Sequence, residues 1–394
     1  MATPLSIQNL IHGKWRTILS MVGISIAIVL IFMQLGFLGA VTDTAVVFYD
    51  EMEFDLLACS PDYYNFVNSG RCSQDDLRTI DSASIVSNVA PLHVSLGKWN
   101  YEAKEVQRGM LILGVNPDET TFTNRDVTDK ISALRQQSAI LIDQTSRPRF
   151  LGADNKEPFS EKQIGLEIEL NGIACRIADL FEIGTGLAAD GATIVHQSQF
   201  QKIVPGYTGD DVSIGLIKLQ DGINIAEAKT QLQEIFPVSA ADKFPQVHIE
   251  ILTRAEIEQR EIDYWQWGTP IGFIFMAGAI VAFLVGGIIV YIVLSSDISK
   301  QIGEYATLKA MGYRNQFLAK TVLEQAFILA LISYICALAV SLVLYQVVGD
   351  LAKLPIRMNV GRLVFVFASS ILMSFISAMI AMRKLRQADP ADLF

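Results

Sequence analysis

The chain has 394 residues, of which 51% are hydrophobic and 18% are charged, and its formal net charge is −10. This composition is too apolar for an ordinary soluble protein and too charged for one that lies wholly within a membrane. Residues 43–263 contain 35 acidic and 19 basic residues, a net charge of −16, whereas the rest of the chain has a net charge of +6. A segment this acidic argues against binding of nucleic acid or of an anionic lipid surface.

Residues 1–17 are predicted to form an interfacial helix on the cytoplasmic side of a membrane. Thr3 is a suitable N-cap, and Pro4 fits the first turn because an N–H at that position would have no partner within the helix. Apolar residues recur at helical spacing from Ile7 to Ile18, with basic residues beside them. The alternative is a basic flank that only orients the first membrane span.

Four uncharged apolar runs are long enough to cross the hydrocarbon layer as helices, which takes about 20 residues each. Basic residues precede the first run, separate the second from the third and follow the last. The positive-inside rule therefore places both termini, including the tail at residues 383–394, in the cytoplasm. A cleaved signal peptide is a weaker interpretation of the first run, which is longer than a signal core and lacks a clear cleavage site. The runs predict transmembrane helices at residues 18–41, 269–294, 321–348 and 363–382.

The short loop at residues 349–362 is an exception to the charge rule. It is predicted to lie outside the membrane, yet it contains Lys353, Arg357 and Arg362 against the single acid Asp350. Because three other segments agree with the rule, we keep this topology and place a basic loop on the outer side.

Residues 42–268 are predicted to form a large α+β extracytoplasmic domain with stalk helices at its two ends. A helix followed by a strand is expected near each end, and these helices would begin after Ser73 and Asn224, which are good N-caps. The two units are interpreted as halves of one lobe, with a second, β-rich lobe inserted at about residues 120–200. Within the insert, alternating apolar residues flank Asn171-Gly172, a pair typical of a two-residue hairpin turn.

Few residues in the sequence suggest reactive chemistry. Cys59 and Cys72 lie 13 positions apart, and we weigh a disulfide between them equally with two unpaired thiols. The chain has no phosphate-binding loop and no paired histidine motif, and the outer domain has no nucleophile elbow. We therefore predict no catalytic residue, metal ligand or cofactor site. Glu324, at the start of the third span, is expected to face water and to pair with Lys320 one turn earlier.

Residues 295–320, between the second and third spans, form the most distinctive segment of the sequence, because a simple reversal of chain direction between two spans needs far fewer residues. The apolar spacing predicts an amphipathic helix on the cytoplasmic face. Its apolar side could fill a groove on a soluble partner or rest on the bilayer, and the periodicity does not distinguish these alternatives. The residues that recur at steps of three or four are Ile298, Ile302, Tyr305, Leu308 and Gly312.

Several stretches resemble segments of the FtsX/MacB-like family of ABC permeases. "GEYATLKAMGYRNQFL" is similar to the family's "REIGxxKAxGxxxxxI", which follows the second span, although Tyr305-Ala306 stands in place of Ile-Gly. "NLIHGKWRTILSMVGISIAI" resembles the N-terminal "NLxRxKxRTxLTxLGIxIG", and "RKLRQADPADLF" resembles the ending "RxAxxLDPxEALR". "IGLEIELNGIACRIADL" is loosely similar to "VGKxIxLNGxxFxVxGV" of the outer domain. The tract "IFMQLGFLGAVTDTAVVFYDEMEFDLL" and the absence of a fused nucleotide-binding domain resemble the DevC-type permeases of cyanobacteria.

The resemblance implies a homodimer of four-span subunits in the plasma (inner) membrane, with porter-like and sabre-like lobes in the outer domain. Two copies of a separate ABC ATPase would bind ATP and Mg, so this chain would hold no cofactor. The outer domains would meet a periplasmic adaptor and, through it, a TolC-like outer-membrane channel. ATP-driven motion would reach the outer domain by mechanotransmission and expel a cargo. The DevC likeness suggests a glycolipid or another envelope component as that cargo.

The resemblance and the helical stripe together assign contact with the ATPase to six positions. The resemblance supplies the positions Glu304, Lys309, Ala310 and Gly312, and the stripe adds Tyr305 and Leu308.

Two alternative functions share the same architecture, namely a lipoprotein-releasing permease and an FtsX-like regulator of a cell-wall hydrolase. A two-lobed outer domain argues against the minimal regulator.

Overall fold

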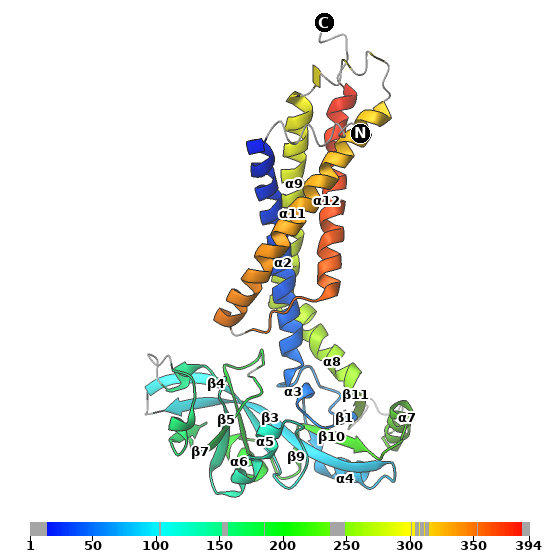
Figure 1. Ribbon diagram of the computed structural model, residues 1–394. Helices are drawn as coiled ribbons and strands as arrows, with labels where there is room; N and C mark the ends of the chain where they lie inside the picture. Colours follow the sequence, from blue (N-terminus) through cyan, green and yellow to red (C-terminus); the bar gives the residue numbers. More distant parts are fainter. Residues whose placement is uncertain are drawn as a thin grey trace. The chain divides into compact units, whose positions relative to one another are not determined.

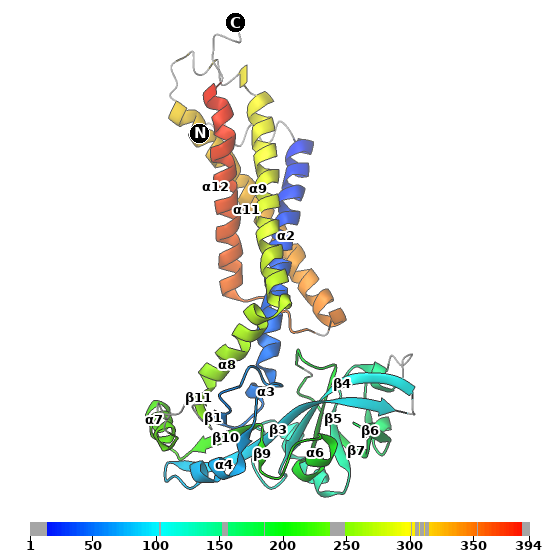
Figure 2. The ribbon, with the colours of Figure 1, turned by 180° about the vertical axis from the view of Figure 1, so that it is seen from behind.

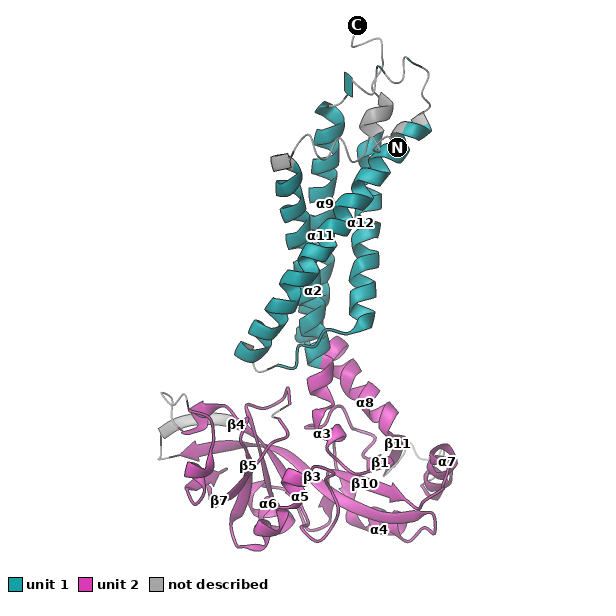
Figure 3. Cartoon of the chain, viewed as in Figure 1, with its two compact units in different colours: residues 1–41, 269–394 teal, residues 42–268 magenta. Residues whose placement is uncertain are grey.

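The chain divides into two compact units, which consist of residues 1–41 with 269–394 and of residues 42–268 (Figure 3). The interfacial helix expected at residues 1–17 lies mostly outside the described residues, as does the tail from residue 388 onward. The computed structural model describes residues 14–101, 104–151, 157–184, 186–236, 249–300, 302–303, 307, 311, 315–352 and 354–387.

In the first unit, the described residues include four long apolar helices, as predicted (Figure 1). Each contains a stretch that is long and apolar enough to cross a membrane, so the chain is a multi-pass membrane protein with four spans. The helices are α2 (Lys14–Ala45), α9 (Pro270–Lys300), α11 (Asn315–Ala352) and α12 (Val360–Gln387). Their candidate spans are Thr17–Ala45, Pro270–Lys300, Ala319–Leu351 and Val360–Met382.

Glycines allow these helices to pack closely. A Cβ atom at Gly36 of α2 would lie 2.6 Å from the ring of Tyr345 in α11. One at Gly286 of α9 would lie 2.5 Å from Sδ of Met373 in α12. Because both distances are far below van der Waals contact, a larger residue at either glycine would displace the neighbouring side chain or the helix that carries it. The bundle thus uses small residues for close packing, as is common in membranes.

The second unit begins and ends with two halves of one antiparallel sheet (Figure 2). Their strands follow the order β11-β1-β10-β3, which is that of a split βαβ, ferredoxin-like lobe. The two predicted helix-then-strand units are therefore confirmed. The first half comprises β1 (Leu56–Cys59), α4 (Gln74–Asp81) and the first part of β3 (Val86–Tyr101). The second comprises β10 (Ile214–Leu219), α7 (Ile225–Ile235) and β11 (Glu250–Thr253).

Both helices of this lobe begin at the predicted caps. Ser73 Oγ accepts a 3.2 Å hydrogen bond from the N–H of Asp75, and Asn224 Oδ1 accepts one of 2.9 Å from Ala226. Each cap satisfies a helix N–H that would otherwise lack a partner. Each helix also buries an apolar pair in one core with the sheet, and each leucine or isoleucine of these pairs stabilises the lobe by about 1.5–3 kcal/mol. These pairs are Leu77 with Ile80 and Ala228 with Leu232.

A β-barrel lobe starts from the same long strand. From His93 onward, β3 pairs with β4 (Lys104–Val115), so the barrel takes in residues that precede the start expected at about residue 120. After β4 the sheet continues through β8 (Gly191–His196), β5 (Ala139–Asp143), β7 (Ile173–Phe181) and β6 (Glu167–Leu170). Strand β6 then pairs with β3 at Trp99↔Leu170, which closes the barrel.

Short elements cover the barrel and connect its strands. Trp99 fills the barrel core, is 1% exposed, and donates a 3.0 Å hydrogen bond from Nε1 to the carbonyl of Phe150. The short β2 (Cys72–Ser73) pairs with β9 (Asp211–Val212) beside the junction of the lobes. The covering elements are α5 (Arg125–Thr128), η1 (Ile131–Arg135), η2 (Pro148–Leu151), η3 (Glu161–Gln163) and α6 (Gln197–Ile203).

The predicted Asn-Gly hairpin between β6 and β7 is confirmed. Leu170 pairs with Ile173, and the turn residues Asn171 and Gly172 have φ values of 49° and 81°, the left-handed conformation that a two-residue turn of this kind requires. The Asn171 side chain accepts a 2.8 Å hydrogen bond from the N–H of Lys98 and donates one of 2.9 Å to a carbonyl of α6. This one residue therefore fixes both the turn and its position on the barrel.

Candidate functional site

The predicted coupling segment is only partly described. Met311 N donates a 3.0 Å hydrogen bond to the carbonyl of Thr307, which is the spacing of an α-helix. Further along, Lys320 Nζ and Glu324 Oε1 lie 3.9 Å apart, so the expected pair is confirmed. The contact positions themselves lie outside the described residues, and their role stays a prediction. They are Glu304, Tyr305, Leu308, Lys309, Ala310 and Gly312.

The disulfide considered for Cys59 and Cys72 is not formed. Both thiols are free and buried, Cys59 at the end of β1 and Cys72 in β2. Cys59 Sγ donates to the carbonyl of Glu250 and Cys72 Sγ to that of Ser213, each at 3.8 Å. Burial raises the pKa of both thiols, so they remain protonated and are poor nucleophiles. These cysteines pack as small apolar residues.

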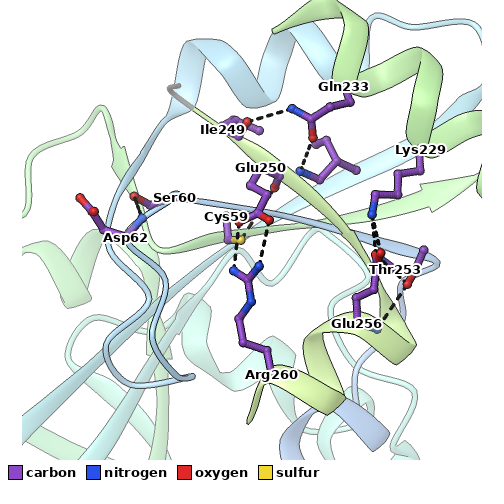
Figure 4. Close-up of polar contacts among 11 residues, drawn as sticks. Cys59, Ser60, Asp62, Lys229, Gln233, Ile249, Glu250, Thr253, Glu256 and Arg260 are labelled. Carbon is purple, nitrogen blue, oxygen red and sulfur yellow. Dashed lines mark hydrogen bonds and ion pairs between the residues drawn. The ribbon is translucent and has the colours of Figure 1, made fainter. Parts of the chain in front are cut away.

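A connected set of polar contacts surrounds helix α8 (Arg254–Asp263) in the described part of the outer domain. The helix follows β11 directly and begins with a capping box, in which Thr253 and Glu256 accept from each other's N–H at 3.3 and 2.8 Å. Lys229 of α7 lies 2.6 Å from the same Glu256 carboxylate (Figure 4). The start of α8 is thus tied to the last strand and to the last helix of the ferredoxin-like lobe.

Arg260 attaches the second half of α8 to β11. Its Nη1 and Nη2 donate hydrogen bonds of 3.0 and 2.8 Å to the two carboxylate oxygens of Glu250 (Figure 4). Such a paired contact fixes orientation as well as distance. Both side chains are about one-third exposed, so the pair contributes only about 1 kcal/mol to stability.

Arg254 attaches α8 to the chain that enters the domain through α3 (Val47–Asp50). Its guanidinium donates to the carbonyls of Tyr49 at 2.5 Å and Met52 at 2.9 Å. Its Cζ also lies 4.1 Å from the centre of the Phe54 ring, a cation–π contact. One side chain therefore joins the last helix of the domain to the segment just before its first strand.

Glu261 makes the most deeply buried of these contacts and is 2% exposed. Its Oε2 accepts hydrogen bonds from the Phe66 N–H at 2.8 Å and from the Tyr63 hydroxyl at 3.1 Å, and its Oε1 accepts from Trp265 Nε1 at 2.9 Å. The Tyr49 hydroxyl lies 3.4 Å from Oε2 and also contacts that of Tyr63. The carboxyl thus joins α8 to α3 and to the loop between β1 and β2.

Burial dominates the acidity of Glu261. Removal from water raises its pKa from 4.5 to about 7, although four donors counter this effect by stabilising the ionised form. The pKa values of Tyr49 and Tyr63 are raised well above their usual range by the same burial. Both phenols therefore stay protonated at physiological pH and can donate to the carboxylate when Glu261 is ionised.

Sequence reasoning did not single out Glu261. The available signal was its position four residues after Ile257, because residues at this spacing lie on one face of a helix. Ile257 is fully buried, so a glutamate on the same face needed a partner inside the protein. Most other residues of α8 are charged or polar, so the sequence shows no apolar stripe that would identify this face of the helix as buried.

This arrangement can hold and orient a helix. Among the described residues, no set of three histidine, cysteine or acidic side chains could hold a metal ion. Just after α8, the π-helix η4 (Tyr264–Gly268) interrupts the regular helix before α9 begins, and such interruptions are frequent at functional sites. Trp267 in η4 is 65% exposed.

Comparisons with known proteins cover both units of the chain. The family model described as MacB-like periplasmic core domain matches residues 17–235, and that described as FtsX-like permease C-terminal matches residues 276–390. No curated protein sequence matches the chain.

Solved structures resemble part of the chain at low identity. The periplasmic region of MacB from Actinobacillus actinomycetemcomitans is 13% identical, with a TM-score of 0.36 over 54% of this chain and 94% of that one. The extracellular domain of the noncanonic ABC-type transporter YknZ from Gram-positive bacteria is 14% identical, with a TM-score of 0.33 over 51% and 99%. A domain of a putative permease protein from Porphyromonas gingivalis is 16% identical, with a TM-score of 0.32 over 52% and 90%.

Proposed function

We propose a transport function on the premise that the chain belongs to the FtsX/MacB-like permeases with a MacB-like periplasmic core domain, the permease components of ABC transporters. In this proposal a separate ABC ATPase binds ATP and Mg and docks on residues 295–320. The permease acts as a homodimer in the plasma (inner) membrane, with both termini in the cytoplasm.

The proposed mechanism is mechanotransmission. Closure of the ATPase would displace the coupling segment and with it α9, which is one helix from Pro270 to Lys300. Along the chain, η4 and α8 precede α9, so motion of the span would reach α8 through η4. The observation that supports this mechanism is the attachment of α8 through Arg254, Arg260 and Glu261. Directional contacts of this kind would make the outer domain follow α8.

The export pathway and cargo are further parts of the proposal. Motion of the outer domain would drive efflux through a periplasmic adaptor and a TolC-like outer-membrane channel. The sequence tract of residues 31–57 supports a DevC-type permease, for which the cargo would be a glycolipid or another envelope component. The two-lobed outer domain, with its closed barrel, favours this role over that of a minimal regulator of a cell-wall hydrolase.

The coupling assignment can be tested in a purified complex with the ATPase. Gly312→Pro and Glu304→Lys should each abolish ATPase activity that depends on transport, because a proline breaks a helix and a lysine reverses the charge at the contact. Lys162→Gln, at a position in the outer domain where the side chain is 79% exposed, serves as the control. Normal membrane insertion of all variants would be checked by their yield in the membrane fraction.

Two results would overturn parts of the proposal. If Gly312→Pro and Glu304→Lys kept full transport-linked ATPase activity, residues 295–320 would not form the contact. If the complex released lipoproteins from the membrane, or activated a hydrolase without exporting any lipid, the export role would be wrong. Mass spectrometry of co-purified proteins and lipids would separate these outcomes.

A further inference from the structure

Strand β11 lies at the end of the strand order of its sheet, with β1 as its only neighbour among the described strands. The backbone N–H and C=O groups on the other side of such an edge strand can pair with a strand of another chain, and native proteins commonly cover them. Residues 249–253, IEILT, favour such pairing because they are rich in β-branched side chains and contain no proline. An uncovered β11 would therefore be a site of strand addition.

Gln233 of α7 covers the middle of this edge. Its Oε1 accepts a 2.9 Å hydrogen bond from the N–H of Ile251, and its Nε2 donates one of 3.4 Å to the carbonyl of Ile249 (Figure 4). Because backbone groups of residues two apart point to the same side of a strand, both of these groups belong to the edge that faces away from β1. The side-chain amide thus supplies the acceptor and the donor that a neighbouring strand would supply.

Lys229, one turn before Gln233, extends this cover. The next N–H along the same edge is that of Thr253, which donates a 2.8 Å hydrogen bond to Glu256 Oε2. Lys229 Nζ lies 2.6 Å from the same carboxylate (Figure 4). Residues four apart lie on one face of a helix, so a single face of α7 covers the edge from Ile249 to Thr253.

We propose that Gln233 prevents the β11 edge from pairing with the same edge of a second, separately diffusing copy of the chain. A second copy fits because two antiparallel copies of one strand, related by a two-fold axis, offer each other the same donors and acceptors. The only charged residue of the strand, Glu250, is already paired with Arg260 at 2.8 Å, so the copies would meet without an unpaired like charge.

Gln233 and an added strand exclude each other, because both need the N–H of Ile251 and the carbonyl of Ile249. Removal of the amide would leave these two groups free to pair with another strand. This inference concerns association between copies of the chain and is independent of the proposed transport function.

The test measures hydrogen exchange in a peptide that contains the Ile251 amide, using the full-length protein in neutral detergent over a roughly 100-fold range of protein concentration. In dilute Gln233→Ala this amide should exchange about five-fold faster than in the unmodified protein, the equivalent of about 1 kcal/mol, because it has lost its acceptor. At high concentration its exchange should slow again, because mass action favours pairing with a second copy. The unmodified protein should show the same exchange throughout.

Two further variants serve as controls. Gln231→Ala changes an exposed residue of the same helix and should behave as the unmodified protein does. Gln233→Glu keeps an acceptor for the Ile251 N–H and should also prevent pairing. Gln233→Ala should fold normally because alanine is a strong helix former.

Three results would overturn the proposal. Fast exchange in Gln233→Ala at every concentration would show that the uncovered edge does not pair. Slow exchange at every concentration would show that another segment covers the edge without Gln233. A response of Gln231→Ala equal to that of Gln233→Ala would show that the association does not depend on the amide of Gln233.

Discussion

Replacement of Glu261 by glutamine tests the effect of the negative charge in the last turn of α8 on the stability of the protein. The amide has nearly the shape of the carboxyl group but cannot ionise, so it resembles the protonated acid at every pH. In the unmodified protein, by contrast, the buried group loses its proton as the pH rises past about 7. The two proteins should therefore differ most at high pH.

The size of this difference follows from the shift in pKa. Because the folded-state pKa of about 7 lies above the usual value of 4.5, the folded state binds the proton more tightly than the unfolded state does. The contribution of Glu261 to stability is therefore complete below the unfolded-state pKa and is lost as the pH rises through the folded-state pKa. The total loss is about 3 kcal/mol, of which about 2.5 kcal/mol falls between pH 5 and pH 8.

The assay is urea unfolding of the full-length protein in neutral detergent, followed by tryptophan fluorescence. The free energy of unfolding of Glu261→Gln minus that of the unmodified protein should increase by about 2.5 kcal/mol from about pH 5 to about pH 8. Glu234→Gln, at an exposed position on α7, should show no such trend. Parallel pH profiles for Glu261→Gln and the unmodified protein would refute the argument that burial controls this carboxyl.

Three further substitutions test other contacts. Arg254→Gln should destabilise the outer domain by about 2 kcal/mol, because two carbonyls lose a charged donor, and hydrogen exchange should increase at residues 49–54. Arg260→Gln should cost about 1 kcal/mol in dilute buffer and less in about 1 M salt, as measured by urea unfolding, because its pair with Glu250 is partly screened. Asn171→Ala should cost about 2–3 kcal/mol in the same assay, since two hydrogen bonds and a residue suited to positive φ are lost. A loss below about 0.5 kcal/mol in any of them would contradict the role given to that residue.

Local features of the fold could be predicted from the sequence because short-range physics determines them. A helix that crosses a membrane needs an apolar run of fixed length, and a two-residue turn needs residues that accept positive φ. Ser73 and Asn224 began helices where their side chains could bond to free N–H groups. Each of these signals lies within a few residues of the element that it determines.

Closure of the barrel could not be predicted in this way. It depends on the pairing of Trp99 with Leu170, which are far apart in the sequence, and on β3 being shared between two lobes. The strands before residue 120 were therefore not expected to belong to the second lobe. Glu261 was missed for a related reason, because only residues on other elements, Phe66 and Tyr63 among them, make its burial favourable.

The two ways in which helices join the ferredoxin-like lobe differ in mechanical consequence. Helices α4 and α7 bury apolar side chains against the sheet, and such contacts are non-directional and tolerate small shifts. In α8, by contrast, Ile257 and Glu261 are the buried residues, and its attachment depends on Arg254, Arg260 and Glu261. Hydrogen bonds weaken steeply when their geometry changes, so α8 resists rotation relative to the sheet more than α4 and α7 do. In the proposed mechanism α8 carries motion into the outer domain, and it would need this resistance, because a helix that slid on an apolar face would move without turning the sheet.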